Sequence, residues 1–140
     1  MSKMKLETVW TEGMSFDSEI NGHKLTIDAD AVVGGLDKGP RPKPLLLEAL
    51  AGCTAMDVVS LAKKMRVDLD AFKVVVEGTV RDEHPKWITH IHLQWVFTGK
   101  NLNHAKLEKA CHLSRDRYCG VFYMLSQSSE ITTEIIYNED

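Results

Sequence analysis

The sequence has little of what marks an exported, membrane-bound or nucleic-acid-binding protein. Its three cysteines are an odd number, which argues against a disulfide framework. Residues 1–7 contain no apolar core, so we expect no secretion signal. The net charge of −3 provides no basic excess for nucleic acid or an anionic membrane. We therefore expect a cytoplasmic protein with reduced thiols that binds neither nucleic acid nor membrane.

Long uninterrupted apolar segments are also scarce. The longest apolar region, residues 45–62, contains Glu48 and Asp57, so its composition makes a poor membrane span. Low-complexity tracts and internal repeats are missing as well, which leaves nothing to divide the chain. We expect residues 1–140 to form one domain, because this length allows one sizeable core.

The apolar patterning predicts strands and helices that are segregated along the chain. Asn21-Gly22 predicts a two-residue turn between two strands, because both positions of that turn need a positive φ. Segregated strands and helices indicate an α+β fold. The expected strands are 6–11, 14–20, 23–27, 72–81, 87–97 and 131–137, and the expected helices are 45–65 and 103–117, with a short helical turn over 121–125.

The segment before the first helix has little regular character. Residues 28–44 contain three glycines and three of the four prolines of the chain, and a connection of this length is often functional. Residues 40–44 should be extended, since a residue before proline is disfavoured in the helical region. The helix at 45–65 is apolar on nearly every side, which indicates burial on more than one face, at the centre of the molecule or of a dimer.

The strand at 87–97 alternates between apolar and polar residues. Trp87, Ile91 and Trp95 should face the core, while His90 and His92 should face away from it. Two histidines at this spacing also occur in metal sites. Because the sequence offers no third ligand nearby, we favour a solvated or interface face.

The cysteines are the residues with the clearest chemical potential. Cys53 lies among small residues within the first helix, which suits either a structural thiol in a tight helix crossing or a substrate beside the sulfur. Cys119 lies near the junction of two helices, where it could meet a partner thiol. Cys111 lies on the apolar face of the second helix, so we expect it in the core.

Two motifs resemble a known family. Residues 44–59, PLLLEALAGCTAMDVV, followed by KKMR at 63–66, resemble the central-helix motif of the OsmC/Ohr family of osmotically inducible and organic hydroperoxide resistance proteins. Residues 114–121, SRDRYCGV, resemble its second cysteine motif, and the OsmC-like branch is the nearer match. The resemblance implies antiparallel sheets around a long central helix, in an intertwined homodimer with its sites at the interface.

The resemblance also implies an activity. Characterised members reduce organic hydroperoxides, and their peroxidatic and resolving cysteines correspond to Cys53 and Cys119. The expected cycle runs through a Cys53 sulfenic acid and a disulfide with Cys119, and a lipoyl- or thioredoxin-type dithiol restores both thiols. This chemistry needs no cofactor and no metal.

One part of the family pattern is missing. A free thiol is only slightly ionised at neutral pH, and family enzymes activate it with an arginine oriented by a glutamate. Arg41 is the best candidate cation, Lys43 the second, and Arg115 and Arg117 are further options. The glutamate is absent, since Lys43 occupies its position. Two alternatives therefore stay open: a non-catalytic protein that binds an apolar ligand at the dimer interface, and a thiol redox sensor.

Overall fold

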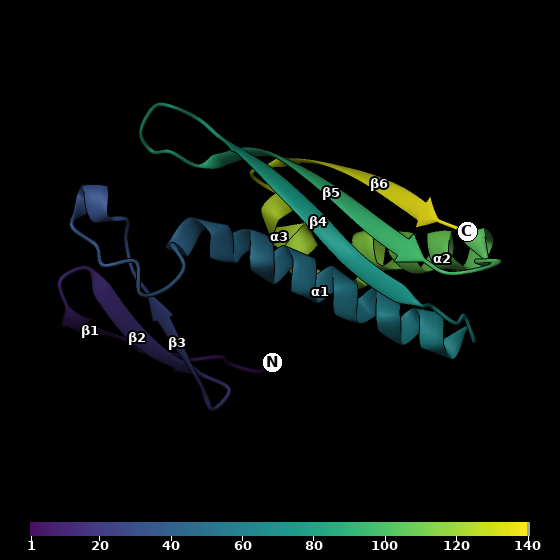
Figure 1. The fold of residues 1–140 in the computed structure, drawn as a ribbon, viewed down its shortest axis with the longest axis horizontal. Coiled ribbons are helices and arrows are strands. Elements are labelled where there is room, and N and C mark those ends of the chain that lie inside the picture. Colours follow the sequence, from purple (N-terminus) through teal and green to yellow (C-terminus); the bar gives the residue numbers. More distant parts are fainter. Residues whose placement is uncertain (140) are drawn as a thin grey trace. The chain divides into compact units, whose positions relative to one another are not determined.

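The N-terminal part of the chain forms a small antiparallel sheet. The computed structural model describes residues 1–139 and divides the chain into two compact units, residues 1–46 and the remainder. In the first unit, β1 (Thr8–Glu12), β2 (Ser15–Ile20) and β3 (His23–Ile27) pair in that order (Figure 1). Asn21 and Gly22 both have positive φ, of 52° and 80°, which confirms the predicted turn.

The segment after β3 is an organised loop built around Asp28. The buried Asp28 carboxylate accepts hydrogen bonds from the backbone N–H groups of Ala29, Leu36 and Lys38, at 2.7, 3.3 and 3.1 Å. These bonds lower the pKa of Asp28, the bond from Ala29 most. A β-carbon at Gly39 would lie 2.0 Å from the Thr26 carbonyl oxygen, so only glycine fits there. A one-turn 3₁₀ helix, η1 (Ala31–Val33), completes the loop.

The long helix begins earlier than the sequence indicated. Helix α1 spans Pro42–Lys64, so the expectation of an extended chain through residue 44 is wrong beyond Arg41. Pro42 and Pro44 both lie in the first turn, where backbone N–H groups have no acceptor within the helix and a proline loses nothing. At Lys43, the steric penalty on a helical residue that precedes a proline is therefore outweighed by the suitability of Pro44 for the first turn.

The second unit is a three-stranded sheet covered by helices on one face. Strands β4 (Ala71–Val80) and β5 (Ile88–Thr98) are antiparallel, and β6 (Glu130–Asn138) pairs with β5 in parallel. Figure 1 shows the helices along one side of this sheet. The parallel pair departs from the expected antiparallel sheets. The helices between β5 and β6 form a crossover that returns the chain to the same end of the sheet, so β6 runs in the same direction as β5. These are α2 (His104–Leu113), the π-helical turn η2 (Ser114–Tyr118) and α3 (Gly120–Ser126).

The core lies between that sheet and its helices. Ile91, Leu93, Trp95 and Phe97 are at most 1 % exposed, which confirms the predicted inward face for most of β5. Trp87 does not follow the pattern, since it precedes β5 and is 39 % exposed. A bulge in the β4–β5 pairing is responsible: Val80 pairs with Ile88 and Thr79 with His90. The extra residue reverses the alternation, so Ile88 is buried instead.

Helix α1 has the length and composition that could also cross a membrane. The sequence expectation of a poor span rested on its two acidic residues, and length and composition alone do not exclude one. A core helix passes the same test, and Leu50, Val58 and Ala62 of α1 pack within the core of the second unit.

Candidate active site

Two cysteines and one aspartate converge in the second unit. Cys53 and Asp57 are four residues apart on α1, so they lie on the same face of the helix. Cys119 is at the junction of η2 and α3. The two sulfur atoms and a carboxylate oxygen of Asp57 all lie within 4.8 Å of one another.

The π-helical turn brings Cys119 to this position. The backbone N–H of Cys119 donates to the Ser114 carbonyl five residues earlier, at 2.8 Å. This bond widens the end of the helix, and Cys119 then leaves the helical region with φ −79° and ψ 98°. Single π turns occur often at functional sites. Here the turn redirects the chain so that the Cys119 side chain faces Cys53 and Asp57. The break falls at Cys119, one residue before Gly120, which begins α3.

A chain of buried hydrogen bonds holds Asp57. The indole N–H of Trp95 donates to Thr54 Oγ1 at 3.0 Å, and Thr54 and Ser114 hydroxyl oxygens are 2.7 Å apart. The Ser114 hydroxyl donates to Asp57 Oδ2 at 2.9 Å. Since the single Ser114 hydroxyl proton is donated to Asp57, Thr54 must be the donor in its hydrogen bond with Ser114, so every bond points toward the carboxylate. The sheet thereby fixes the acidic group beside the sulfurs.

Cys119 is the more enclosed of the two thiols. Its side chain is 3 % exposed, and its sulfur accepts the backbone N–H of Phe122 at 3.3 Å, which caps α3. Burial, together with the neighbouring Cys53 and Asp57, raises the pKa of Cys119 to about 12. Cys53 is half-buried, so reagents reach it more readily.

Cys111 belongs to the core, as the sequence predicted. It is fully buried among the core residues, and burial raises its pKa to about 12. A protonated, enclosed thiol is chemically inert.

Comparison with known proteins identifies the family. The OsmC-like protein family matches residues 35–134. The chain belongs to the OsmC-like family. Protein YhfA of Escherichia coli strain K12 is 36 % identical over 130 residues, which cover 92 % of this chain and 94 % of YhfA.

Solved structures have the same fold as this OsmC-like chain. A hypothetical protein from Aquifex aeolicus is 28 % identical with a TM-score of 0.82, covering 99 % of this chain and 100 % of that one. An organic hydroperoxide resistance protein from Legionella pneumophila has a TM-score of 0.71 at 15 % identity, covering 97 % and 98 %. The expected α+β architecture with a long central helix is thus confirmed.

The sequence offers four candidate cations for the Cys53 thiolate. Arg41 lies in the N-terminal unit, where its guanidinium bonds to Asp37 and lies 3.5 Å from Asp30. Lys43 is exposed in the first turn of α1. In the second unit, Arg115 forms a two-point ion pair with Asp116, at 2.7 and 2.8 Å, and Arg117 lies over the ring of Tyr118.

A hollow adjoins the site on the Asp57 side. It has a volume of 310 Å³ and is lined by Asp57, Ser60, Leu61, Lys64 and Tyr118. Sequence reasoning did not single out Lys64, a cation of the same helix as Cys53. It also missed Thr54 and Ser114, because their contact joins residues 60 positions apart. Only the four-residue spacing of Cys53 and Asp57 was visible in the sequence.

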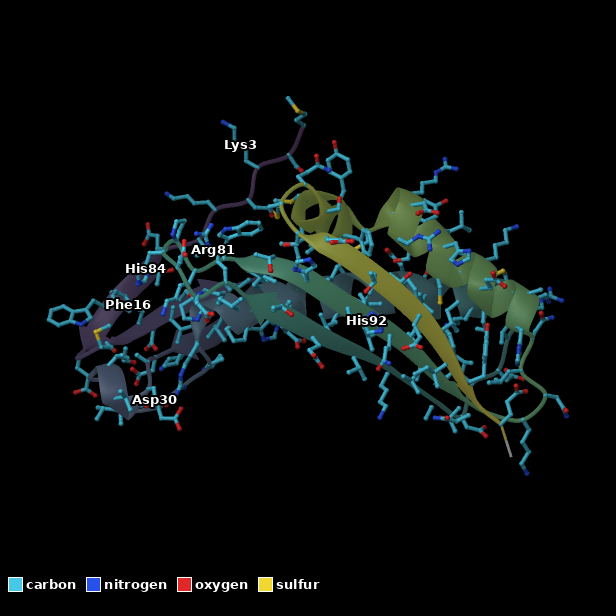
Figure 2. All side chains as sticks on the ribbon, turned by 90° about the horizontal axis from the view of Figure 1, so that it is seen from above. Lys3, Phe16, Asp30, Arg81, His84 and His92 are labelled. Atoms are coloured by element: carbon cyan, nitrogen blue, oxygen red, sulfur yellow. The ribbon has the colours of Figure 1, made fainter. Side chains whose placement is uncertain are left out.

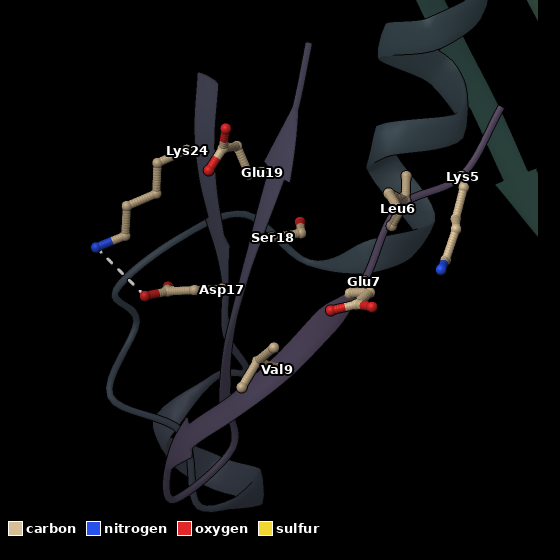
Figure 3. Close-up of a pocket in the computed structure, with 8 residues that line it drawn as sticks. All are labelled: Lys5, Leu6, Glu7, Val9, Asp17, Ser18, Glu19 and Lys24. Atoms are coloured by element: carbon tan, nitrogen blue, oxygen red, sulfur yellow. Dashed lines mark ion pairs between the residues drawn. The ribbon is translucent and has the colours of Figure 1, made fainter. Parts of the chain in front are cut away.

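Two further polar regions contain no cysteine. In the N-terminal unit, a wide hollow of 590 Å³ is lined by residues before β1 and on β1–β3, with Lys24 3.2 Å from Asp17 (Figure 3). On the sheet of the second unit, His92 is exposed (Figure 2) and lies 2.7 Å from Thr132 Oγ1 and 3.2 Å from Glu134. His90 is likewise exposed, which agrees with the expected solvated face.

Proposed function

We propose that this chain reduces organic hydroperoxides with Cys53 as the attacking thiol and Cys119 as the resolving thiol. The observation that carries the proposal is the approach of the two sulfur atoms to within 4.8 Å, with the half-buried thiol beside the enclosed one. A disulfide requires an S–S distance of about 2.05 Å, which a modest movement at the η2–α3 junction would supply. Family membership and the Legionella relative's description as an organic hydroperoxide resistance protein support the same reaction.

The reaction balances without a metal or organic cofactor. The Cys53 thiolate attacks the outer peroxide oxygen, so an S–O bond forms, the O–O bond breaks and the alkoxide leaves as an alcohol after taking a proton. The Cys119 thiol then attacks the sulfenic sulfur, and water leaves as the disulfide forms. A dithiol reductant donates two electrons and two protons to restore both thiols through a mixed disulfide.

Arg41 is the candidate for stabilising the Cys53 thiolate. It is the family-based choice, and its two carboxylate partners would orient it as the missing glutamate does in the family enzymes. Lys64 lies eleven residues further along α1 than Cys53, a rise of about 16 Å, so its side chain does not reach that thiolate. Replacement of Arg41 by Gln should slow peroxide attack, and Lys64→Gln is the matched control.

The test is peroxide consumption in the presence of a dithiol. Wild type should turn over cumene hydroperoxide, Cys53→Ser should be inactive, and Cys119→Ser should stop after one turnover with a sulfenic acid trapped by dimedone. Cys111→Ala is the matched control and should keep full activity. Turnover that survives Cys53→Ser would overturn the assignment. Fast disulfide formation with negligible turnover would instead identify a redox sensor.

We also propose that the chain acts as a cytoplasmic homodimer. The second unit exposes several large apolar side chains on α1, η2 and α3, which a partner subunit would cover. These are Met56, Val59, Tyr118, Tyr123 and Met124.

A further inference from the structure

We infer that the reduced chain binds one thiophilic divalent cation such as Zn²⁺ through Cys53 Sγ, Cys119 Sγ and a carboxylate oxygen of Asp57. The three ligand atoms come from two elements of one compact unit and lie within 4.8 Å of one another. The inference does not rest on the peroxide reaction, because it concerns the thiols as ligands.

The donor set selects the metal. Two thiolates favour zinc and other thiophilic ions over Mg²⁺ or Ca²⁺, while the carboxylate oxygen disfavours Cu(I). In a tetrahedral zinc site with bonds of about 2.0–2.3 Å, ligand atoms are about 3.3–3.8 Å apart. The present separations of at most 4.8 Å therefore need a contraction of at most about 1.0–1.5 Å.

Two of the three ligand side chains already receive hydrogen bonds that would orient them. The Ser114 hydroxyl donates to Asp57 Oδ2, and the Phe122 N–H donates to Cys119 Sγ. Such outer contacts fix the lone pairs of metal ligands and reduce the cost of ordering them on binding. Asp57 is fixed further through Thr54 and Trp95, so the carboxylate does not have to be recruited from solvent.

A fourth coordination position would be open. Asp57 lines the 310 Å³ hollow, whose space allows a water molecule to complete a tetrahedron. Binding converts both thiols to thiolates and releases their two protons to solvent, while two Zn–S bonds form. A cation held in this way occupies both sulfurs, so metal and peroxide would exclude each other at the site.

The experiment is a titration of the full-length, reduced, metal-free chain with Zn²⁺ in competition with a chromophoric chelator. One equivalent should bind, and Co²⁺ in its place should give a thiolate-to-cobalt charge-transfer band with tetrahedral d–d absorption. Cys119→Ser and Asp57→Asn should each weaken Zn²⁺ binding, Cys119→Ser by about 100-fold or more. Ser114→Ala should weaken it by about 10- to 100-fold, the usual effect of removing an orienting contact.

Matched variants separate this site from others. Cys111→Ala removes a buried thiol outside the cluster, and His92→Ala removes the exposed His92–Glu134 pair; neither should change Zn²⁺ affinity. Asp57→Cys should restore the binding that Asp57→Asn loses, which rules out simple misfolding as the cause. Unchanged binding in Cys119→Ser, or a Co²⁺ spectrum without a thiolate band, would overturn the inference. Zinc binding without peroxidase turnover would support this inference and contradict the proposed function. Turnover without zinc binding would do the reverse.

Discussion

At the scale of single residues, the buried hydroxyl of Thr54 joins the sheet to the reactive sulfurs. Every buried side-chain nitrogen and oxygen within residues 1–139 has a hydrogen-bond partner, and Thr54 serves two of them. Thr54→Val keeps the shape but leaves the Trp95 N–H without an acceptor, so it should cost about 1–3 kcal/mol of unfolding free energy in urea. Paired with Ser114→Ala in a double-mutant cycle, it should be non-additive by about 0.5 kcal/mol or more. Strict additivity would mean that the two hydroxyls act independently.

The three thiols should also differ sharply in reactivity. Because the pKa of Cys111 is raised to about 12, only about one in ten thousand of its thiols is ionised at pH 8. Iodoacetamide should therefore modify Cys53 of the native reduced protein first, at a rate at least about 100-fold above that of Cys111. Peptide mass spectrometry over time measures both rates, and unfolding in guanidinium should abolish the difference. Equal rates in the native protein would contradict the burial of Cys111.

Much of the site was predictable residue by residue, and what was missed has a clear physical cause. The cysteine motifs pointed to Cys53 and Cys119, which the structure brings together, and the four-residue spacing that puts Asp57 on the same helix face as Cys53 is visible in the sequence. Ser114 stood within the quoted motif, yet its contacts with Thr54 and Asp57 depend on how α1 meets η2. Periodicity along one element carries no information on such crossings between elements.

At the scale of elements, the loop after β3 depends on one carboxylate. Asp28→Asn replaces an acceptor oxygen with an NH₂ group, so one or two loop N–H bonds are lost and Tm at pH 7 should fall by several degrees. The pKa of Asp28 is lowered in the folded chain, so its stabilisation is present above the unfolded pKa of about 3.9 and is lost as the pH falls through the folded value. The gap between variant and wild type should thus close only below about pH 4. Urea unfolding from pH 7 to pH 2.5 measures it, with the exposed Asp68→Asn as control. A gap independent of pH would contradict the role of the charge.

The accuracy of the sequence reading differed among elements for local reasons. β3 is found at its predicted residues, because alternation and the Asn21-Gly22 turn act within a few positions. The start of α1 and the buried face at the beginning of β5 differ from the prediction, because local sequence rules do not capture the features that set them. In α1 the first-turn prolines lose no hydrogen bond. In β5 one bulge residue turns the side chains that precede it to the opposite face of the sheet.

At the scale of the whole molecule, the order of strands and helices was sufficient to predict the α+β class, whereas strand direction was not. Whether β6 runs parallel or antiparallel to β5 depends on the path of three helical segments, which a sequence pattern does not encode. The proposed dimer lies beyond both, since it depends on the surface that one subunit presents to another. Met56 is 76 % exposed on α1, two residues from the buried Thr54, so the two side chains lie on opposite sides of the helix.

This exposure makes Met56 the test of the dimer. Met56→Glu would place a carboxylate in an apolar interface without a partner, so the dissociation constant of the dimer should rise by about 100-fold or more. Size-exclusion chromatography with light scattering over a dilution series measures the dissociation constant. Ala105→Glu adds the same charge at an exposed position in the first turn of α2 and should leave the dimer intact. A wild type that is monomeric at micromolar concentration, or a Met56→Glu variant that dimerises as wild type does, would mean that the apolar side chains of α1 are not an interface between subunits.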